Sequence, residues 1–304
     1  MIERITERSA DFIKVFAPAK INLFLAVTGK RADQYHELVT VLGKLSIGDT
    51  LEIRRDSSSK GIKLTCPGYP ELENGNNLVF QAVEKWLSRT GENWGVQISL
   101  HKEIPPMSGL GGGSSDAVSA LIAVNELGRN KLSNAELSSL SAEIGSDCPS
   151  FFTNGLCIAE GRGEMVRQLG LQAAQKLIGK KVLLFRPNIG LSTAEIYSRL
   201  SENQKYSSME WATDQVDRWE NDQLSTGDFL HNDLEGAVFD KHRYFPALFE
   251  QIQSVYALTP RLSGSGSACF VLLPEDFDRL TQLKEAIFEA WGDDSWVKYA
   301  EIIN

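Results

Sequence analysis

Glycines and serines make up most of the stretch Ser108–Ser115, a composition suited to holding an anion against the backbone. The preceding residues 96–101 alternate apolar and polar side chains, which predicts a strand, and residues 117–127 carry Ala, Leu and Val at helical spacing. Glycine tolerates positive φ and leaves N–H groups exposed, and the residue types from Ser114 to Asp116 begin helices. Because a helix N-terminus attracts negative charge, the stretch predicts a phosphate cradle.

A plain turn, a Walker loop and a dinucleotide-binding motif are the alternatives to a phosphate cradle here. A tight turn between a strand and a helix needs only one or two glycines. A Walker phosphate loop ends in Gly-Lys-Ser/Thr, and no Lys follows these glycines. A dinucleotide-binding motif of an oxidoreductase fits Gly109–Gly113 only loosely and predicts an acidic residue about 20 residues later. The chain has Asn130-Lys131-Leu132 there, so the residues favour phosphate binding.

Lys20 and Asn22 interrupt an apolar, strand-like run from Phe12 to Thr28, and their equal parity puts both on one side of the strand. An edge strand with one wet face would explain them. The alternative is a cation that serves an anion, because an ammonium among apolar neighbours is otherwise costly. Tyr35 and His36, in the polar segment that follows, offer a ring face and hydrogen-bonding groups, with plain packing as the alternative.

The composition is that of an ordinary soluble globular protein of 304 residues, and the length suggests two domains, expected at 1–186 and 187–304. A net charge of −9 argues against a general nucleic-acid binder and still allows a phosphorylated small substrate. The four cysteines show no zinc spacing and predict buried thiols in a reducing compartment. The chain has no apolar run that could span a bilayer and its start is too charged for a signal peptide, so we expect a cytoplasmic protein without a membrane partner.

The elements that must hold these residues follow from periodicity and capping signals. Asn77 is expected to cap a helix over 79–87, and Ser133 with Glu136 to form the capping box of a helix that ends at Ile144. Asp147 stands where a helix breaks before Pro149, as a functional carboxylate or as a cap. The remaining expectations are strands at 39–45, 51–54, 62–66 and 181–185, helix starts at Ser192 and Asn232, a glycine-serine loop at Ser263–Gly266 before an apolar strand, and a helix at 280–291.

Three of these motifs resemble, in order and spacing, the three signature motifs of the GHMP small-molecule kinases. They are the strand Pro18-Ala19-Lys20-Ile21-Asn22-Leu23, the loop from Pro106 to Ser115, and the late loop Ser263-Gly264-Ser265-Gly266. The segments from Arg31 to Leu38 and from Gly145 to Pro149 are similar to the branch that phosphorylates 4-diphosphocytidyl-2-C-methyl-D-erythritol. The family usually has Gly where Gln34 stands, so the turn before Tyr35 is expected to differ locally.

The resemblance implies a two-domain α+β fold, with an N-terminal βαβ-containing nucleotide domain and a C-terminal ferredoxin-like domain. It implies ATP with Mg²⁺ as cofactor and a cytidine diphosphate derivative of methylerythritol as small-molecule substrate. The reaction would be phosphorylation of its 2-hydroxyl in the non-mevalonate route to isoprenoid precursors. The alternatives are another GHMP kinase, for homoserine, mevalonate or a sugar, and a non-catalytic sensor on the same fold.

Carried over by position, the resemblance also implies a role for each residue of the motifs. Asp147 would be the general base and Lys20 its charged neighbour. Contacts to ATP are implied for Asn77, Leu78, Lys102, Pro106, Met107, Ser108, Gly109, Leu110, Gly111, Gly112, Gly113, Ser114, Ser115 and Asp116. Contacts to the substrate are implied for Asn22, Tyr35, His36, Thr193, Tyr197, Ser265 and Gly266, with Tyr197 at the position of an aromatic that stacks on the base. No metal ligand is assigned.

Overall fold

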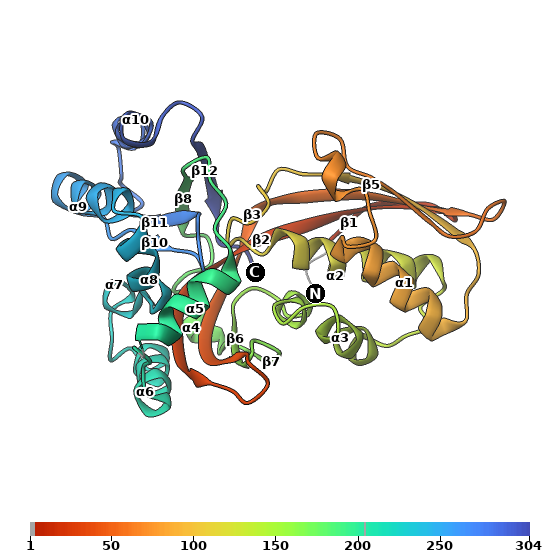
Figure 1. Cartoon of the computed structure of the whole chain (residues 1–304), viewed down its shortest axis with the longest axis horizontal. Helices are drawn as coiled ribbons and strands as arrows, with labels where there is room; N and C mark the ends of the chain where they lie inside the picture. Colours follow the sequence, from red (N-terminus) through yellow and green to blue (C-terminus); the bar gives the residue numbers. More distant parts are fainter. Residues whose placement is uncertain (1–3, 204) are drawn as a thin grey trace. The chain divides into compact units, whose positions relative to one another are not determined.

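The computed structural model describes residues 4–203 and 205–304, and its helices and strands form two compact units that are each discontinuous in sequence (Figure 1). The first unit contains 4–19, 47–105 and 111–154. The second contains 20–46, 106–110 and 155–304. The expected sequential division at 186/187 stays a prediction. The glycine loop is shared, with its front part 106–110 in the second unit and its rear part in the first.

The first unit is a twisted sheet covered by helices. Its strands are β1 (Ile5–Arg8), the first part of β2 (Phe12–Lys30), the second part of β3 (His36–Asp56), β4 (Ile62–Thr65) and β5 (Gly95–His101), in the order β1-β2-β3-β5-β4. Its helices are η1 (Pro70–Leu72), α1 (Leu78–Thr90), α2 (Gly112–Leu127), α3 (Asn134–Ala142) and η2 (Cys148–Phe152). β4 and β5 are parallel and joined through α1, which confirms the expected βαβ unit. Trp86 of α1 is fully buried in its core.

The second unit contains a four-stranded antiparallel sheet in the order β10-β11-β8-β12. These strands are β8 (Lys181–Arg186), β10 (Arg261–Leu262), β11 (Cys269–Leu273) and β12 (Trp296–Glu301), with α10 (Leu280–Trp291) between β11 and β12. Helices α5 (Thr193–Asn203), α6 (Met209–Glu220), α7 (Thr226–Phe229), α8 (Leu234–Lys241) and α9 (Tyr244–Tyr256) lie between β8 and β10 in the chain. This is the connectivity of a ferredoxin-like fold, as expected.

The rest of the second unit is built on the continuations of the two long strands. β6 (Cys157–Gly161) pairs with β3 and β7 (Met165–Gln168), α4 (Leu171–Gln175) follows, and the short β9 (His231–Asn232) runs parallel to β2. The core of this unit joins Leu25 and Val27 of β2 to Phe185 of β8, Phe245 of α9 and Val271 of β11. No helix within the described residues is long and apolar enough to cross a membrane.

Local signals predicted several element boundaries and missed others. Asn77 caps α1 by accepting from Val79 N at 2.9 Å, and Ser133 and Glu136 form the capping box of α3, so both predictions are confirmed. The expected strands 39–45 and 51–54 are one strand, β3, which passes straight through Gly48. A Cβ on Gly48 would lie 2.1 Å from Ala17 O, so this glycine allows close strand packing instead of a turn.

Candidate functional site

Lys20 lies on β2 with 4% of its surface exposed, which makes it one of the few buried cations of the chain. Its Nζ donates to Asn22 Oδ1 at 2.6 Å and to the carbonyl oxygen of Gly109 at 2.9 Å. Asn22 is equally buried, so the prediction that the two share one face of the strand is confirmed and the wet edge strand is wrong. A buried ammonium is tolerable because these acceptors replace water.

Asn22 is itself fixed by a chain of hydrogen bonds. Its Nδ2 donates to Thr40 Oγ1 at 2.9 Å, and the Thr40 hydroxyl donates to Phe24 O at 2.6 Å. The amide of Asn22 therefore has one orientation, with its oxygen toward Lys20. Thr40, on β3, was not expected from the sequence, where nothing distinguishes it from other strand residues.

The front part of the glycine loop packs against the late loop, Ser263–Ser267. Ser263 Oγ donates to Gly109 O at 2.9 Å, and Ala268 N donates to Ser108 O at 2.9 Å. Gly109 has φ 79°, and a Cβ there would lie 2.1 Å from Ser263 O. Gly109 is thus required for the contact between the two loops, and its carbonyl accepts from both Lys20 and Ser263. All three sequence motifs meet here.

The rear part of the loop begins α2. The expected helix start at Ser114–Asp116 is wrong: α2 begins at Gly112, with Gly111 at φ 69° as its N-cap and no side chain capping it. The first-turn N–H groups therefore need another acceptor. Ser115 Oγ and Asp116 Oδ1 are buried, and neither has a hydrogen-bond partner in the described part of the chain. A Cβ on Gly113 would meet only Leu78 Cδ1, at 3.8 Å, and this helix start fits an anionic group such as a phosphate.

Lys102 follows β5 and is held by two buried carboxylates. Its Nζ lies 2.5 Å from Asp49 Oδ2 and 2.8 Å from Asp116 Oδ2, and Asp49 Oδ1 accepts from the backbone N–H of Glu103 and Ile104 at 2.6 and 2.9 Å. Burial raises the pKa of the Asp116 carboxyl to about 8, against the opposing effect of the Lys102 ammonium. Asp49 was not expected from the sequence, because Gly48-Asp49 resembles a turn.

Asn77 and Leu78 were expected near the adenine. Both polar atoms of the Asn77 amide are already bonded, since Oδ1 caps α1 and Nδ2 donates to Leu72 O at 2.9 Å. Leu78 is half-buried, and its Cδ1 is 3.8 Å from where a Cβ of Gly113 would be, so it borders the helix start of α2. Of these two residues, Leu78 therefore has its side chain next to the first turn of α2, the turn that fits a phosphate.

Asp147 is the N-cap residue of η2 and is half-buried. Its side chain makes no capping hydrogen bond, so the structural alternative of a capping carboxylate is wrong. The adjacent Cys148 is buried, and burial raises the pKa of its thiol to about 12, which leaves the thiol protonated. Asp147 belongs to the first unit and Lys20 to the second.

His36 lies between two tyrosine rings of the second unit, Tyr197 and Tyr206. The rings of His36 and Tyr197 have centroids 4.8 Å apart, and His36 Nε2 is 2.8 Å from Ser201 Oγ. Burial and the charge of Lys30 lower the pKa of His36. Tyr35 is 53% exposed, with the Arg162 guanidinium 5.0 Å from its ring centroid. The His36 and Tyr197 rings touch each other, so a base can stack on an outer ring face only.

Gln34 has φ 70°, the conformation that the usual glycine of this turn would adopt without strain. Its N–H donates to Arg31 O at 3.2 Å, and Arg31 N donates to Tyr35 O at 2.8 Å, which closes the turn. The turn therefore keeps a glycine-like backbone despite the side chain.

Thr193 and Ser265 lie together, with their hydroxyl oxygens 2.9 Å apart. Gly266 has φ 77°, and a Cβ there would lie 2.9 Å from Leu262 Cδ2. At the front of the glycine loop, Arg186 donates to Pro106 O at 3.3 Å, and Met107 is 61% exposed at φ 54°. The sequence alone does not mark Arg186 as a residue that holds the loop, because it stands at the end of an ordinary apolar strand.

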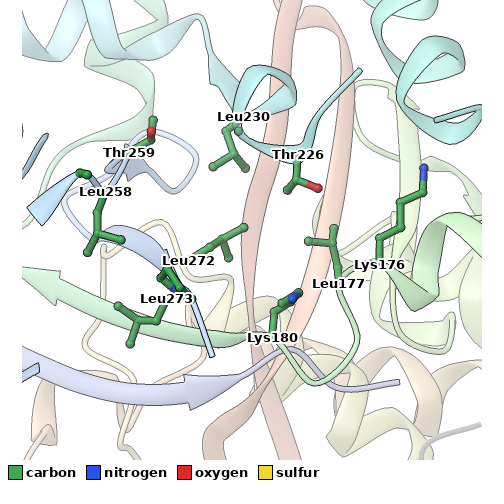
Figure 2. Close-up of a pocket in the computed structure, with 12 residues that line it drawn as sticks. Lys176, Leu177, Lys180, Thr226, Leu230, Leu258, Thr259, Leu272 and Leu273 are labelled. Atoms are coloured by element: carbon green, nitrogen blue, oxygen red, sulfur yellow. The ribbon is translucent and has the colours of Figure 1, made fainter. Parts of the chain in front are cut away.

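A cavity of about 360 Å³ opens elsewhere in the second unit, at the segment 176–180 after α4, at α7 and at β11 (Figure 2). Leucines line it, among them Leu177, Leu230 and Leu272, and it includes none of the expected site residues. Lys176 at its edge already binds Trp219 O at 2.6 Å and Asp222 at 2.6 Å. Among the described residues, no cluster of three or more His, Cys, Asp or Glu side chains could hold a metal ion.

Comparison with known proteins gives a consistent result. Residues 77–155 match the family described as GHMP kinases N terminal domain. A 4-diphosphocytidyl-2-C-methyl-D-erythritol kinase of Syntrophus aciditrophicus is 36% identical, over 90% of this chain and 93% of that protein. A crystal structure of 4-(cytidine 5'-diphospho)-2C-methyl-D-erythritol kinase aligns with a TM-score of 0.74 at 29% identity, over 95% of this chain and 99% of that one. A homoserine kinase from Cytophaga hutchinsonii has the same TM-score at 19% identity, over 98% and 96%, which shows the shared fold alone.

Proposed function

Because the chain belongs to the GHMP kinases, and within them to the 4-diphosphocytidyl-2-C-methyl-D-erythritol kinases, we propose that it transfers the γ-phosphoryl group of ATP to the 2-hydroxyl of that substrate. The product would be the 2-phosphate, in the non-mevalonate route to isoprenoid precursors. Identity of 36% over nearly the whole length favours this substrate over homoserine, mevalonate or a sugar. The fold by itself would not choose among them, since the homoserine kinase aligns equally well.

The observation that supports the proposal best is the group around Gly109 O. There the ammonium of Lys20 and the hydroxyl of Ser263 converge on one carbonyl of the glycine loop. A buried cation bonded to the front part of the glycine loop is suited to offset negative charge as a phosphoryl group is transferred. If the strand that carries Lys20 served packing alone, a buried ammonium and a hydroxyl bonded to Gly109 O would not be needed there.

Asp147 is proposed as the general base. The acceptor alcohol loses its proton as its oxygen attacks phosphorus, and a carboxylate within hydrogen-bonding distance can take that proton. Because the Asp147 side chain caps no helix, the start of η2 does not require a carboxylate at this position. Lys20, the charged neighbour that the resemblance implies, would offset the negative charge that develops on the oxygens.

The N-terminus of α2 is proposed to bind the ATP phosphates. The N–H groups from Gly112 to Ser114 need acceptors, and the backbone at Gly113 is open to close approach. Mg²⁺ would accompany the nucleotide and neutralise phosphate oxygens. The side chain of Lys102 is committed to Asp49 and Asp116, so we propose that Lys102 shapes the nucleotide site through that ion group.

The cytidine end of the substrate is proposed to bind at Tyr35, His36 and Tyr197. The lowered pKa of His36 keeps its imidazole neutral at pH 7, and because Nε2 is paired with Ser201 Oγ, Nδ1 is the ring nitrogen proposed to bond the base. The exposed ring of Tyr35 offers a stacking face for a pyrimidine. Asn22 is proposed at the cytidine end as well, and Thr193, Ser265 and Gly266 would contact the remainder of the substrate.

The test is ADP release by the purified chain with ATP and Mg²⁺, in parallel with 4-diphosphocytidyl-2-C-methyl-D-erythritol, homoserine, mevalonate and galactose. We expect turnover with the cytidine substrate and at least a hundredfold lower kcat/KM with the others, since these lack the base that supplies about 3 kcal/mol or more of binding. Preferred turnover of homoserine or mevalonate would refute the substrate. ATP binding without transfer to any acceptor would favour the sensor.

A further inference from the structure

Asn232 is a buried amide whose polar atoms are all bonded to backbone. It is 5% exposed, and its Nδ2 donates to Leu262 O at 2.9 Å and to Gly264 O at 2.8 Å. Its Oδ1 accepts from Leu234 N at 2.9 Å. Neither the resemblance nor the proposed roles involve this residue, although it begins a polar motif, Asn232-Asp233-Leu234-Glu235.

Asp233 and Glu235, the other polar residues of the motif, also bond to backbone groups near Asn232. Asp233 Oδ2 accepts from Val27 N at 2.7 Å, next to the point where β9 runs parallel to β2. Glu235 Oε1 accepts from Leu262 N at 2.9 Å. The motif therefore ties β2, which carries Lys20, to the chain that enters the late loop, and it uses both the N–H and the carbonyl of Leu262.

The late loop in turn packs on the Lys20 group. Gly264 has φ 58°, and a Cβ on it would lie 3.2 Å from Asn22 Oδ1 and 3.5 Å from Lys20 Nζ. One residue earlier, the Ser263 hydroxyl donates to Gly109 O, the carbonyl that also accepts from Lys20. The backbone of the late loop thus forms one wall around the ammonium.

We propose that Asn232 is a positioning residue for phosphoryl transfer: by holding Leu262 O and Gly264 O, it sets the late loop and, through it, the position of Lys20. The proposal rests on the proposed function for its kinetic consequence only. Removing the amide leaves two buried carbonyls without their donor, so the loop must move to reach water. A shift of the order of 1 Å in a catalytic group can cost about a hundredfold in rate.

The experiment compares Asn232→Ala with a matched control, Asn125→Ala. Asn125 is also buried, at 4% exposed, and its amide is bonded to Trp86 Nε1 and to both backbone groups of Leu132 in the first unit. Both substitutions remove a buried, fully bonded amide, so their general effect on stability should be similar. Only Asn232 has the link to the late loop.

Two readouts are taken below the unfolding temperature of each variant. The first is kcat and KM for ATP and for the cytidine substrate. The second is amide hydrogen exchange over 262–268, where Ser263 N, Gly266 N and Ala268 N donate within the loops. We expect Asn232→Ala to lower kcat about ten- to a hundredfold with both KM values within about threefold, and to speed exchange in this segment. Asn125→Ala should do neither.

Equal losses of kcat in the two variants would overturn the proposal, as would a raised KM at unchanged kcat or unchanged exchange in the late loop. If Asn232→Ala does not fold, Ser263→Ala replaces it, because it breaks the link to Gly109 O with little change of shape and should give the same kinetic pattern. Should the wild-type chain fail to phosphorylate the cytidine substrate, the proposed function fails separately. Hydrogen exchange then decides alone whether Asn232 holds the late loop.

Discussion

Gly113 differs from Gly109 and Gly112 because an added Cβ there would make only an ordinary van der Waals contact with the described residues. The nearest atom to an added Cβ is Leu78 Cδ1 at 3.8 Å, whereas a Cβ on Gly112 would lie 3.1 Å from Lys102 Nζ. We expect Gly113→Ala to keep or raise the free energy of unfolding, by up to about 1 kcal/mol, because Ala favours a helix. If phosphate approaches this backbone, the KM for ATP should rise about tenfold, a loss of ~1.4 kcal/mol.

Urea unfolding and steady-state kinetics measure the two effects of Gly113→Ala independently. Gly112→Ala is the contrasting variant, since its methyl group would push on the Lys102 ion group and should lower stability as well. An unchanged KM for ATP in a stable Gly113→Ala protein would remove this glycine from the nucleotide site.

Gln34 holds a left-handed conformation that costs a side-chain-bearing residue roughly 1–2 kcal/mol. Glycine avoids that cost and loses ~0.5–1 kcal/mol through its greater freedom when unfolded. We therefore expect Gln34→Gly to raise the free energy of unfolding by up to about 1 kcal/mol and to leave substrate KM nearly unchanged. Asn130, at φ 53°, is the control, because Asn tolerates this region and Asn130→Gly should gain less. A destabilised Gln34→Gly would show that the Gln side chain supports the turn.

Asp147→Asn tests the general base with minimal change of shape. We expect ATP and substrate to bind with nearly wild-type affinity while kcat falls by about two to four orders of magnitude, the usual contribution of a general base. The unfolding temperature of the variant is measured as well, so that a loss of kcat is not mistaken for a loss of folded protein. Binding is followed by calorimetry and turnover by ADP release. Near-wild-type kcat would exclude Asp147 as the base.

At the scale of elements, the Lys102 ion group joins β3, the end of β5 and α2 in the first unit. Two carboxylates share one ammonium there, so the group carries an excess negative charge when all three are ionised. Burial opposes that charge and raises the pKa of Asp116 to about 8, from about 3.9 in an unfolded chain. Between these values the folded protein binds more protons than the unfolded chain, so stability falls as pH rises.

Asp116→Asn should abolish this pH dependence. We expect the free energy of unfolding of the variant, relative to wild type, to increase as pH rises from about 4 to about 8. Urea titrations at several pH values in that window measure the difference. Asp240→Asn, at a carboxylate on the surface of α8, is the control and should differ from wild type by a nearly constant amount. A constant difference for Asp116→Asn too would mean that Asp116 is ionised throughout.

At the scale of the whole molecule, the second core joins residues far apart in the sequence. Leu25 and Val27 pack with Leu183, Phe185 and the buried residues after 190. We therefore expect a fragment 1–186, which keeps the first core but leaves these side chains of the second core without partners, to unfold at a lower urea concentration than the full chain, as followed by circular dichroism. A fragment as stable as the full chain would support 1–186 as an autonomous domain. A two-fragment mixture of 1–186 and 187–304 that regains the stability of the full chain would support the shared core.

Local spacing by itself predicted the shared face of Lys20 and Asn22 and the capped helix starts. The alternation around Lys20 and Asn22 put both on one face, and Asn77 and Ser133 capped helices as expected, because such signals act within a few residues.

Only the tertiary structure decided which distant groups meet. The strand through Gly48, the Asp49–Lys102 pair and the bonds of Asn232 join positions between about 30 and 55 residues apart, and Ser263 reaches Gly109 across 154. Local periodicity does not encode such pairs, because it reports only on residues within one element. Two distant polar groups pair when folding buries both of them away from water.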